Sequence, residues 1–337
     1  MNPVLPRITL ITPSYQQARY LEECLASVHD QGYPNLEHIV VDGGSTDGSI
    51  AIIERYADKL AWWCSEPDNG QSHAINKGLE HATGSVFGWL NSDDVLLPGA
   101  LQRVGEAFAV DATMNVLTGA RITRDPEGND TRLPTDDPLK PDTFFTAPKV
   151  NQQSTFYRME AVQAVHRVEE RLRYVMDYEL WLQVLFTQGS EGVRVVPWDL
   201  AVFRHHPESK TSTQQPRFLD EIASVLHGAC LRTGHGDLME VLALGHTITP
   251  GLRALPVDGT HAILVRRMTI AFLLKWHHLI YSARDFHMMK RLCTSVGLRD
   301  EPLENGQRRL AEQVEAQVRV PGWWAFRLRR KWEHLAG

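Results

Sequence analysis

The first 110 residues alternate short apolar runs with segments of helical spacing, and this order limits the folds open to the chain. The runs predicted as strands are Arg7–Thr12, Glu37–Val41, Ala61–Ser65 and Val86–Leu90. The segments predicted as helices are Ala18–Gln31, Ser49–Tyr56, Ser72–Ala82 and one that opens at Pro98. Strands that alternate with helices imply right-handed βαβ units and a parallel sheet. We therefore predict an α/β fold for this part of the chain.

Polar and turn-forming residues stand at the end of each predicted strand. They are Pro13–Tyr15, Asp42, Glu66–Asp68 and Asn91–Asp94. Ligands of open α/β sheets bind beyond the carboxyl ends of the strands, so this pattern predicts a ligand site. No G-K-[ST] follows the glycines after Asp42, and no G-x-G-x-x-G follows the first strand. A P-loop and a dinucleotide-binding fold are therefore disfavoured.

The pattern becomes mixed after residue 115. We predict a hairpin of Asn115–Thr123 with Thr131–Leu133, a strand over Gln152–Tyr157, a helix over Asp177–Gln188, and a last strand or pair over Val193–Phe203. Beyond residue 217 the spacing is helical. The 337 residues allow two domains, which we expect to be residues 1–213 and a mostly helical appendage, residues 214–337. We expect the appendage either to face the acceptor or a membrane, or to serve oligomerisation.

The charge of the chain, −6 overall, is unevenly distributed. Residues 205–337 carry 18 basic and 13 acidic side chains, whereas residues 1–204 carry 17 basic and 28 acidic ones. An acidic body is a poor nucleic-acid binder, so we expect no nucleic-acid partner. It suits a metal–nucleotide site, because a divalent cation reconciles carboxylates with phosphates. Separated cysteines and the lack of a signal-peptide pattern or long apolar run favour a cytoplasmic protein.

Several side chains are candidates for chemistry, and each has a structural alternative. Asp93 and Asp94 follow an apolar strand and suit a hard divalent ion, or they cap the helix that opens at Pro98. Asp177 begins a helix and is a candidate general base or an N-cap. Asp42 is a ligand-facing acid or an Asx-turn residue.

Aromatic and basic side chains supply further candidates. Tyr15 follows the first strand, and its ring stacks on a nucleobase or packs in the core. His205 and His206, next to Arg204, suit a diphosphate or belong to a solvated loop. The segment Trp323–Trp332 mixes aromatic and basic residues, which is typical of an interfacial helix at a membrane, and a helix docked on the body is the alternative.

Five stretches in this order resemble family 2 glycosyltransferases, which have the GT-A fold. The stretches are ITPSYQQARYLEECLASV, HIVVDGGSTDGS, SEPDNGQSHAINKGLEHATG, FGWLNSDD, and MDYELWL with FRHHPESKT. The resemblance covers roughly residues 8–213 and is nearest to the bacterial subgroup that builds O-antigen and other surface polysaccharides. Such enzymes move a sugar from a nucleotide-diphosphate sugar, most often a UDP-sugar, to an acceptor hydroxyl with inversion.

The resemblance also implies roles for individual residues. Pro13 and Tyr15 would form the nucleobase wall, and Asp42 would accept a hydrogen bond from the base. Asp93 would contact the ribose or the metal, and Asp94 would hold Mn²⁺ or Mg²⁺ against the diphosphate. Asp177 would deprotonate the acceptor, which is a glycan or a lipid-linked sugar, and Arg204 and His206 would close over the diphosphate.

The sequence departs from the family pattern at a few positions. Asn91 stands where the metal motif often begins with Asp, and Met176 stands where a Glu usually precedes the base. These departures leave two alternatives open: a sugar-phosphate nucleotidyltransferase, and a non-catalytic binding module on a degenerate transferase fold. The loop PSYQQARY lacks the glycine-rich, basic character that a nucleotidyltransferase needs, and the intact Asp94 and Asp177 argue against a degenerate module.

Overall fold

The computed structural model describes residues 4–136, 140, 142–146, 148–209 and 214–336, with the side chains of residues 332–336 left out. The chain divides into two compact units. Unit 1 comprises Met1–Pro141 and Pro148–Gln215, and unit 2 comprises Asp142–Ala147 and Pro216–Gly337. We expected a boundary after residue 213. That the two units are separate domains stays a prediction.

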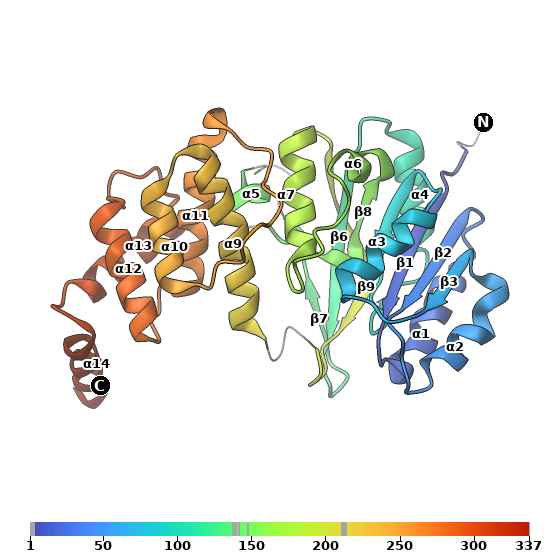
Figure 1. Cartoon of the computed structure of the whole chain (residues 1–337), viewed down its shortest axis with the longest axis horizontal. Helices are drawn as coiled ribbons and strands as arrows, with labels where there is room; N and C mark the ends of the chain where they lie inside the picture. Colours follow the sequence, from blue (N-terminus) through green and yellow to red (C-terminus); the bar gives the residue numbers. More distant parts are fainter. Residues whose placement is uncertain (1–3, 137–139, 141, 147, 210–213, 337) are drawn as a thin grey trace. The chain divides into compact units, whose positions relative to one another are not determined.

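Unit 1 is built on a nine-stranded mixed sheet with the order β3-β2-β1-β4-β8-β6-β9-β5, and β7 pairs with β6 (Figure 1). The strands are β1 (Ile8–Ser14), β2 (Leu36–Asp42), β3 (Trp62–Ser65), β4 (Val86–Trp89), β5 (Val95–Leu96), β6 (Val116–Arg124), β7 (Asp130–Leu133), β8 (Thr155–Arg158) and β9 (Val193–Arg204). The first four strands pair in parallel, and β8 joins them to β6 by antiparallel pairing.

Helices cover both faces of the parallel part of the sheet. The helices of unit 1 are α1 (Ala18–His29), α2 (Ser49–Tyr56), α3 (Gln71–His81), α4 (Ala100–Val110), α6 (Met159–Ala164) and α7 (Met176–Gln188), with 3-10 turns at Ala57–Lys59 and Gln152–Ser154. One core cluster joins Leu10 of β1 to Cys24 of α1 and Val104 of α4. The opposite face of β1 meets α3, where a Cβ on Gly78 would lie 2.8 Å from the Ile11 side chain. Successive strand residues point to opposite faces, which explains this division.

The spacing of apolar residues accounts for the helices of this part. In α1 the buried residues Leu21, Cys24, Leu25 and Val28 recur every three or four positions. The structure contains elements that differ from the predicted ones. A short strand, β5, precedes α4, and the predicted strand at Gln152 begins with a 3-10 turn. The short helices α5 (Thr143–Thr146) and α6 (Met159–Ala164) lie outside the predicted elements. The parallel pairing predicted for the first 110 residues is confirmed.

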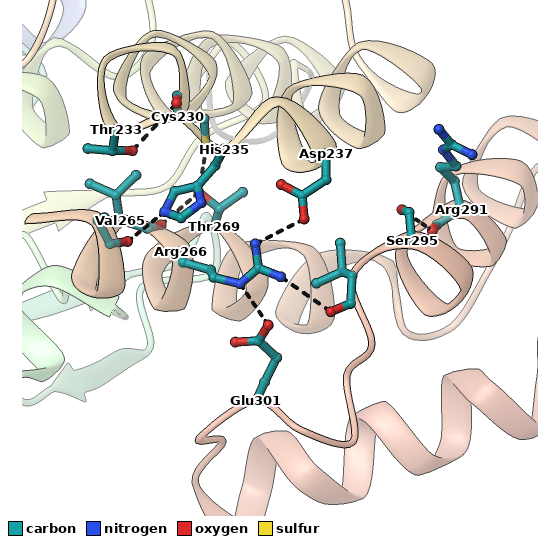
Figure 2. Close-up of polar contacts among 12 residues, drawn as sticks. Cys230, Thr233, His235, Asp237, Val265, Arg266, Thr269, Arg291, Ser295 and Glu301 are labelled. Carbon is teal, nitrogen blue, oxygen red and sulfur yellow. Dashed lines mark hydrogen bonds and ion pairs between the residues drawn. The ribbon is translucent and has the colours of Figure 1, made fainter. Parts of the chain in front are cut away.

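Unit 2 is helical in its described residues. Besides α5, its helices are α9 (Gln215–Thr233), α10 (Gly236–Gly245), α11 (Ala262–His277), α12 (Ala283–Ser295), α13 (Asn305–Val318) and α14 (Trp323–Ala336). Arg266 of α11 joins three segments of this unit. It donates to Asp237 at 2.9 Å, to Glu301 at 2.7 Å and to the Val296 carbonyl at 3.2 Å (Figure 2).

None of the described helices has both the length and the apolar character that crossing a bilayer requires. The longest run of buried apolar residues in unit 2 lies in α11, which has 16 residues and carries Arg266 and Arg267. Arg267 pairs with Asp142 at 2.9 Å, so the short segment that contains α5 is tied to α11 by charge as well as packing.

Candidate functional site at the carboxyl edge of the sheet

The carboxyl ends of β1, β2 and β3 lie side by side. In the register of these parallel strands, Ser14 is opposite Asp42, and Asp42 is opposite Ser65. β4 pairs with the other side of β1, so Asn91–Asp94 begin at the same edge. The side chains that the sequence predicted at four strand ends therefore share one edge of the sheet.

Asp42 organises the turn that follows β2. Its Oδ2 accepts hydrogen bonds from the Gly44 N–H at 3.1 Å, the Ser45 N–H at 2.8 Å and the Ser65 hydroxyl at 2.7 Å. Its Oδ1 accepts from the Ser45 hydroxyl at 2.6 Å. The geometry is therefore that of an Asx turn. Among the described residues, Oδ1 accepts from the Ser45 hydroxyl only, so one of its two acceptor positions is open.

Tyr15 lies beside this turn and extends into solvent. Its side chain is 62% exposed, so the alternative that it packs in the core is wrong. A Cβ on Gly43 would lie 3.2 Å from the Tyr15 ring and 3.0 Å from the Asp68 carboxylate. A side chain at position 43 would therefore crowd both groups. Pro13 lies in β1 itself, paired with Val41.

Asp94 is a fully buried carboxylate. Its Oδ1 accepts from the Arg204 backbone N–H at 3.1 Å, and its Oδ2 accepts from Gln153 Nε2 at 3.1 Å. Burial raises the pKa of Asp94 well above its usual value, and the charge of Asp93 raises it further. The N-cap of α4 is Gly99, so neither Asp93 nor Asp94 caps that helix.

Asp93 is paired with the loop that follows β9. Its Oδ2 lies 3.0 Å from Nε2 of His206, and His206 is 6% exposed. The ring of Tyr20 lies 4.7 Å from the His206 ring, between centroids. The two adjacent acids therefore meet the two ends of the Arg204–His206 segment, Asp94 through the backbone of Arg204 and Asp93 through the imidazole of His206.

The Arg204 side chain is only partly engaged. Its Nη1 lies 2.9 Å from a Glu23 oxygen, and its guanidinium carbon lies 5.5 Å above the Tyr20 ring. Its Nε and Nη2 are buried and have no hydrogen-bond partner among the described residues. Burying an N–H donor without an acceptor costs free energy. The position of these two donors at the carboxyl end of β9 therefore favours a ligand with acceptor oxygens.

Asp177 is a partly exposed residue in the first turn of α7. The N-cap of this helix is Val175, so the N-cap interpretation of Asp177 is wrong. Burial lowers the pKa of the Arg121 guanidinium, and the charges of Asp94 and Asp177 both oppose that shift. Burial raises the pKa of Tyr157, and Asp177 adds to that rise. Arg121 therefore interacts electrostatically with both Asp177 and Asp94.

Sequence reasoning missed the groups that support these acids. Gln153 bonds both to Asp94 and, at 3.4 Å, to Arg121 Nη1. Asn91 accepts from Gln71 at 2.6 Å and donates to Gln152 at 3.3 Å, so it belongs to an amide network. No periodicity or motif marks a glutamine pair or an arginine on a distant strand, and only the pairing of β6 and β8 brings them to the edge.

The residues present fit a divalent ion that arrives with a nucleotide. Among the described residues, no three His, Cys, Asp or Glu side chains form a group that could hold a metal by themselves. Mg²⁺ at nucleotide sites is bound through one or two carboxylates plus substrate phosphates. A buried carboxylate with a raised pKa and an acid as its neighbour, as at Asp94, is stabilised in its charged form by a cation.

The comparisons with known proteins agree with this geometry. Residues 9–167 match the family model described as "Glycosyl transferase family 2". Curated relatives are uncharacterized glycosyltransferases. One from Mycobacterium tuberculosis is 34% identical over 121 residues, or 35% of this chain and 46% of that protein. One from Rickettsia felis is 26% identical over 200 residues, or 55% of this chain and 32% of that protein.

Solved structures resemble almost the whole chain in fold. TarS 1-349 of S. aureus, solved with UDP-GlcNAc, has a TM-score of 0.53 and 19% identity over 93% of this chain and 90% of that one. Mannosyltransferase PcManGT of Pyrobaculum calidifontis, solved with GDP-Man and Mn²⁺, has a TM-score of 0.51 and 18% identity over 93% and 85%. At this identity the likeness concerns the fold.

The fold is the GT-A fold that the sequence predicted, and the chain shares it with the TarS and PcManGT structures. Residues 9–167 resemble glycosyl transferase family 2, whose model they match. The matched segment spans 32% of the Rickettsia felis relative and 46% of the Mycobacterium tuberculosis one, so the chain covers less than half of these curated relatives.

Proposed function

We propose that this chain transfers a sugar from a nucleotide-diphosphate sugar to an acceptor hydroxyl. The observation that carries the proposal is the meeting of Asp93 and Asp94 with the Arg204–His206 segment at the carboxyl edge of the sheet. That arrangement combines adjacent carboxylates with cationic and imidazole groups, the chemistry that binds a metal-bound diphosphate. The TarS and PcManGT structures, which hold UDP-GlcNAc and GDP-Man, support a donor of this class.

The base of the nucleotide lies at β1 and β2 in this proposal. Tyr15, with its exposed ring, stacks on the base, and Pro13 forms the wall behind it. Asp42 receives an N–H of the base at the open position of Oδ1, and the family resemblance favours uracil and hence a UDP-sugar. The turn that Asp42 holds brings Gly43 close to Tyr15, and a glycine there leaves room for the base.

The diphosphate lies between β4 and the end of β9. Asp94, with Asp93 beside it, would hold Mn²⁺ or Mg²⁺, and the ion would neutralise the charge that develops on the leaving nucleoside diphosphate. Arg204 directs its unpartnered Nε and Nη2 to the phosphate oxygens. His206, which pairs with Asp93, lies beside the same group.

Asp177 acts as the general base in this proposal. It takes the proton of the acceptor hydroxyl, and the oxygen then attacks the anomeric carbon from the face opposite the diphosphate. A single displacement of this kind inverts the anomeric configuration. Arg121 interacts electrostatically with Asp177, and this cation supports a single carboxylate as the base where Met176 replaces the usual Glu.

We place the reaction in bacterial surface polysaccharide or O-antigen assembly, with a glycan or lipid-linked acceptor at the inner face of the membrane. The family resemblance supports this role. The basic balance of residues 205–337 supports an acceptor that carries phosphate.

The test is a transfer assay with UDP- and GDP-sugars, Mn²⁺, and a lipid-linked or polyprenyl-phosphate sugar acceptor. We expect release of the nucleoside diphosphate with one donor and a product of inverted configuration by NMR. Release of pyrophosphate from a nucleoside triphosphate and a sugar phosphate would instead identify a nucleotidyltransferase. Failure to bind any donor would identify a degenerate module.

A further inference from the structure

Helix α14 presents an apolar and basic surface to solvent. Trp324 is 74% exposed and Leu328, one turn later, is 58% exposed. Arg327 and Lys331 are exposed on the same helix, and the Arg327 guanidinium carbon lies 5.7 Å above the Trp324 ring. We call these four residues the α14 face.

The packing of the helix determines which side is free. Phe326 is 3% exposed and its ring lies 5.5 Å from that of Phe286 in α12, between centroids. Trp323 lies 6.1 Å from the same Phe286 ring. At 3.6 residues per turn, Trp324 and Leu328 lie well away from the side of Phe326. The helix is therefore anchored by one apolar side and still exposes a second one.

The charge of this surface favours an anionic membrane over a second copy of the chain as its partner. The segment from Arg319 to Lys331 contains five basic residues and no acidic one. A second copy of α14 would bring like charges together, which disfavours a symmetric contact through this face. An anionic bilayer offers the opposite charge together with an apolar layer for the indole and the leucine.

We infer that the α14 face docks this protein on an anionic membrane surface, with Trp324 and Leu328 entering the headgroup boundary and Arg327 and Lys331 contacting lipid phosphates. Tryptophan and arginine are enriched at this depth because each has an apolar body and a polar end. Tyr281, 72% exposed, lies next to the helix, because Arg330 donates to the carbonyls of Leu279 and Ile280 at 3.4 Å. This inference identifies where the proposed transferase would meet a lipid-linked acceptor, but it does not depend on donor chemistry.

The experiment is co-sedimentation of the full chain with vesicles in the absence of nucleotide. Vesicles of phosphatidylcholine alone are compared with vesicles of equal parts phosphatidylcholine and phosphatidylglycerol. We expect binding to the anionic vesicles only, and a loss of binding near 1 M salt, where the screening length falls to about 3 Å. Arg327→Gln with Lys331→Gln should weaken partitioning by about tenfold or more, because two charges near the surface are lost.

Trp324→Ala with Leu328→Ala should weaken partitioning to a similar extent by removing apolar area. The matched controls are Ile263→Ala, an apolar residue that is 73% exposed in α11, and Arg309→Gln, an exposed arginine of α13. Both controls should bind as the unaltered chain does. Equal binding to both vesicle types, binding that survives both double substitutions, or a concentration-dependent dimer that Trp324→Ala abolishes would overturn the inference. Circular dichroism checks that each variant is folded, and a donor-binding assay reports separately on the proposed transferase site.

Discussion

Arg204 in unit 1 and Arg266 in unit 2 are both partly buried cations, and they differ in how many of their donors are satisfied. Arg266 engages Nε, Nη1 and Nη2, with two carboxylates and a carbonyl as acceptors (Figure 2). Arg204 has one carboxylate partner, Glu23, which is itself 61% exposed, and leaves Nε and Nη2 without acceptors among the described residues. An arginine whose donors all have acceptors holds helices together. An arginine at the carboxyl end of a strand whose donors lack acceptors can bind a ligand through them. The difference separates an arginine that holds helices together from one that leaves donors available to a ligand.

The largest effect that we expect comes from the base in unit 1. Asp177→Asn should lower kcat by about 10²–10⁴-fold, the usual contribution of general base catalysis. Donor binding should be retained, because the proposed donor contacts lie at Asp94, Arg204 and His206. Transfer rates and nucleotide titration measure the two quantities separately. Full turnover of Asp177→Asn would remove Asp177 from the mechanism.

Replacing each of the two arginines with glutamine should have different consequences. Arg204→Gln should lower kcat by roughly 10²-fold, since one donor to the developing charge is lost, with little change in stability. Arg266→Gln should lower the free energy of unfolding by about 2 kcal/mol, less than for a fully buried pair because its side chain is 22% exposed. Its turnover per folded molecule should stay unchanged.

Thermal unfolding and transfer assays on both variants test this contrast directly. If Arg204→Gln destabilised the protein as much as Arg266→Gln and transferred sugar normally, the two arginines would have the same structural role. The comparison between the units would then fail.

The smallest effects concern acid stability. Burial, with a contribution from His29, lowers the pKa of His38 in β2 to about 3, and burial lowers that of His246 in unit 2 to about 4. In the unfolded chain both histidines take up a proton near pH 6.5. The free energy of unfolding that each contributes is therefore lost as the pH falls from about 6.5 toward the pKa of that histidine in the folded state.

His38→Gln should remove this dependence from unit 1 alone, by up to about 1.4 kcal/mol per pH unit. Urea unfolding between pH 7 and pH 5, followed for the unaltered chain and for His38→Gln and His246→Gln, measures the two contributions. An unchanged slope in His38→Gln would show that His38 is not buried as a neutral side chain. Because the two histidines lie in different units, the experiment also shows which unit responds first to acid.

The sequence predicted the parallel half of unit 1 well, because alternation of strands and helices is a local signal. It also predicted that Asp42, Asp93 and Asp94 share one edge, because parallel strands bring their carboxyl ends together. The pairing of Asp93 with His206 joins residues 113 positions apart, and it was anticipated only as a shared diphosphate role through the family resemblance.

Sequence patterns do not predict the residues that support Asp94. Arg121 and Gln153 reach Asp94 because β6 pairs with β8 and β9, and such non-local pairing leaves no periodic trace in either segment. The short helix α5 belongs to unit 2, although it lies within residues 1–213, which the sequence predicts to form one domain. Long-range packing decides these features, and local propensity does not.

The central claim is that the carboxyl edge of unit 1 binds a nucleoside diphosphate, and a thermal shift experiment tests it most directly. UDP, GDP, UDP-sugars and GDP-sugars are added to the unaltered chain and to the Arg204→Gln variant, with and without Mn²⁺. A ligand at 100 times its Kd stabilises by about 2.7 kcal/mol, which gives a clear shift. We predict a shift with one nucleotide that Mn²⁺ enhances and Arg204→Gln reduces. No shift with any nucleotide, or an equal shift in Arg204→Gln without any effect of Mn²⁺, would contradict the account.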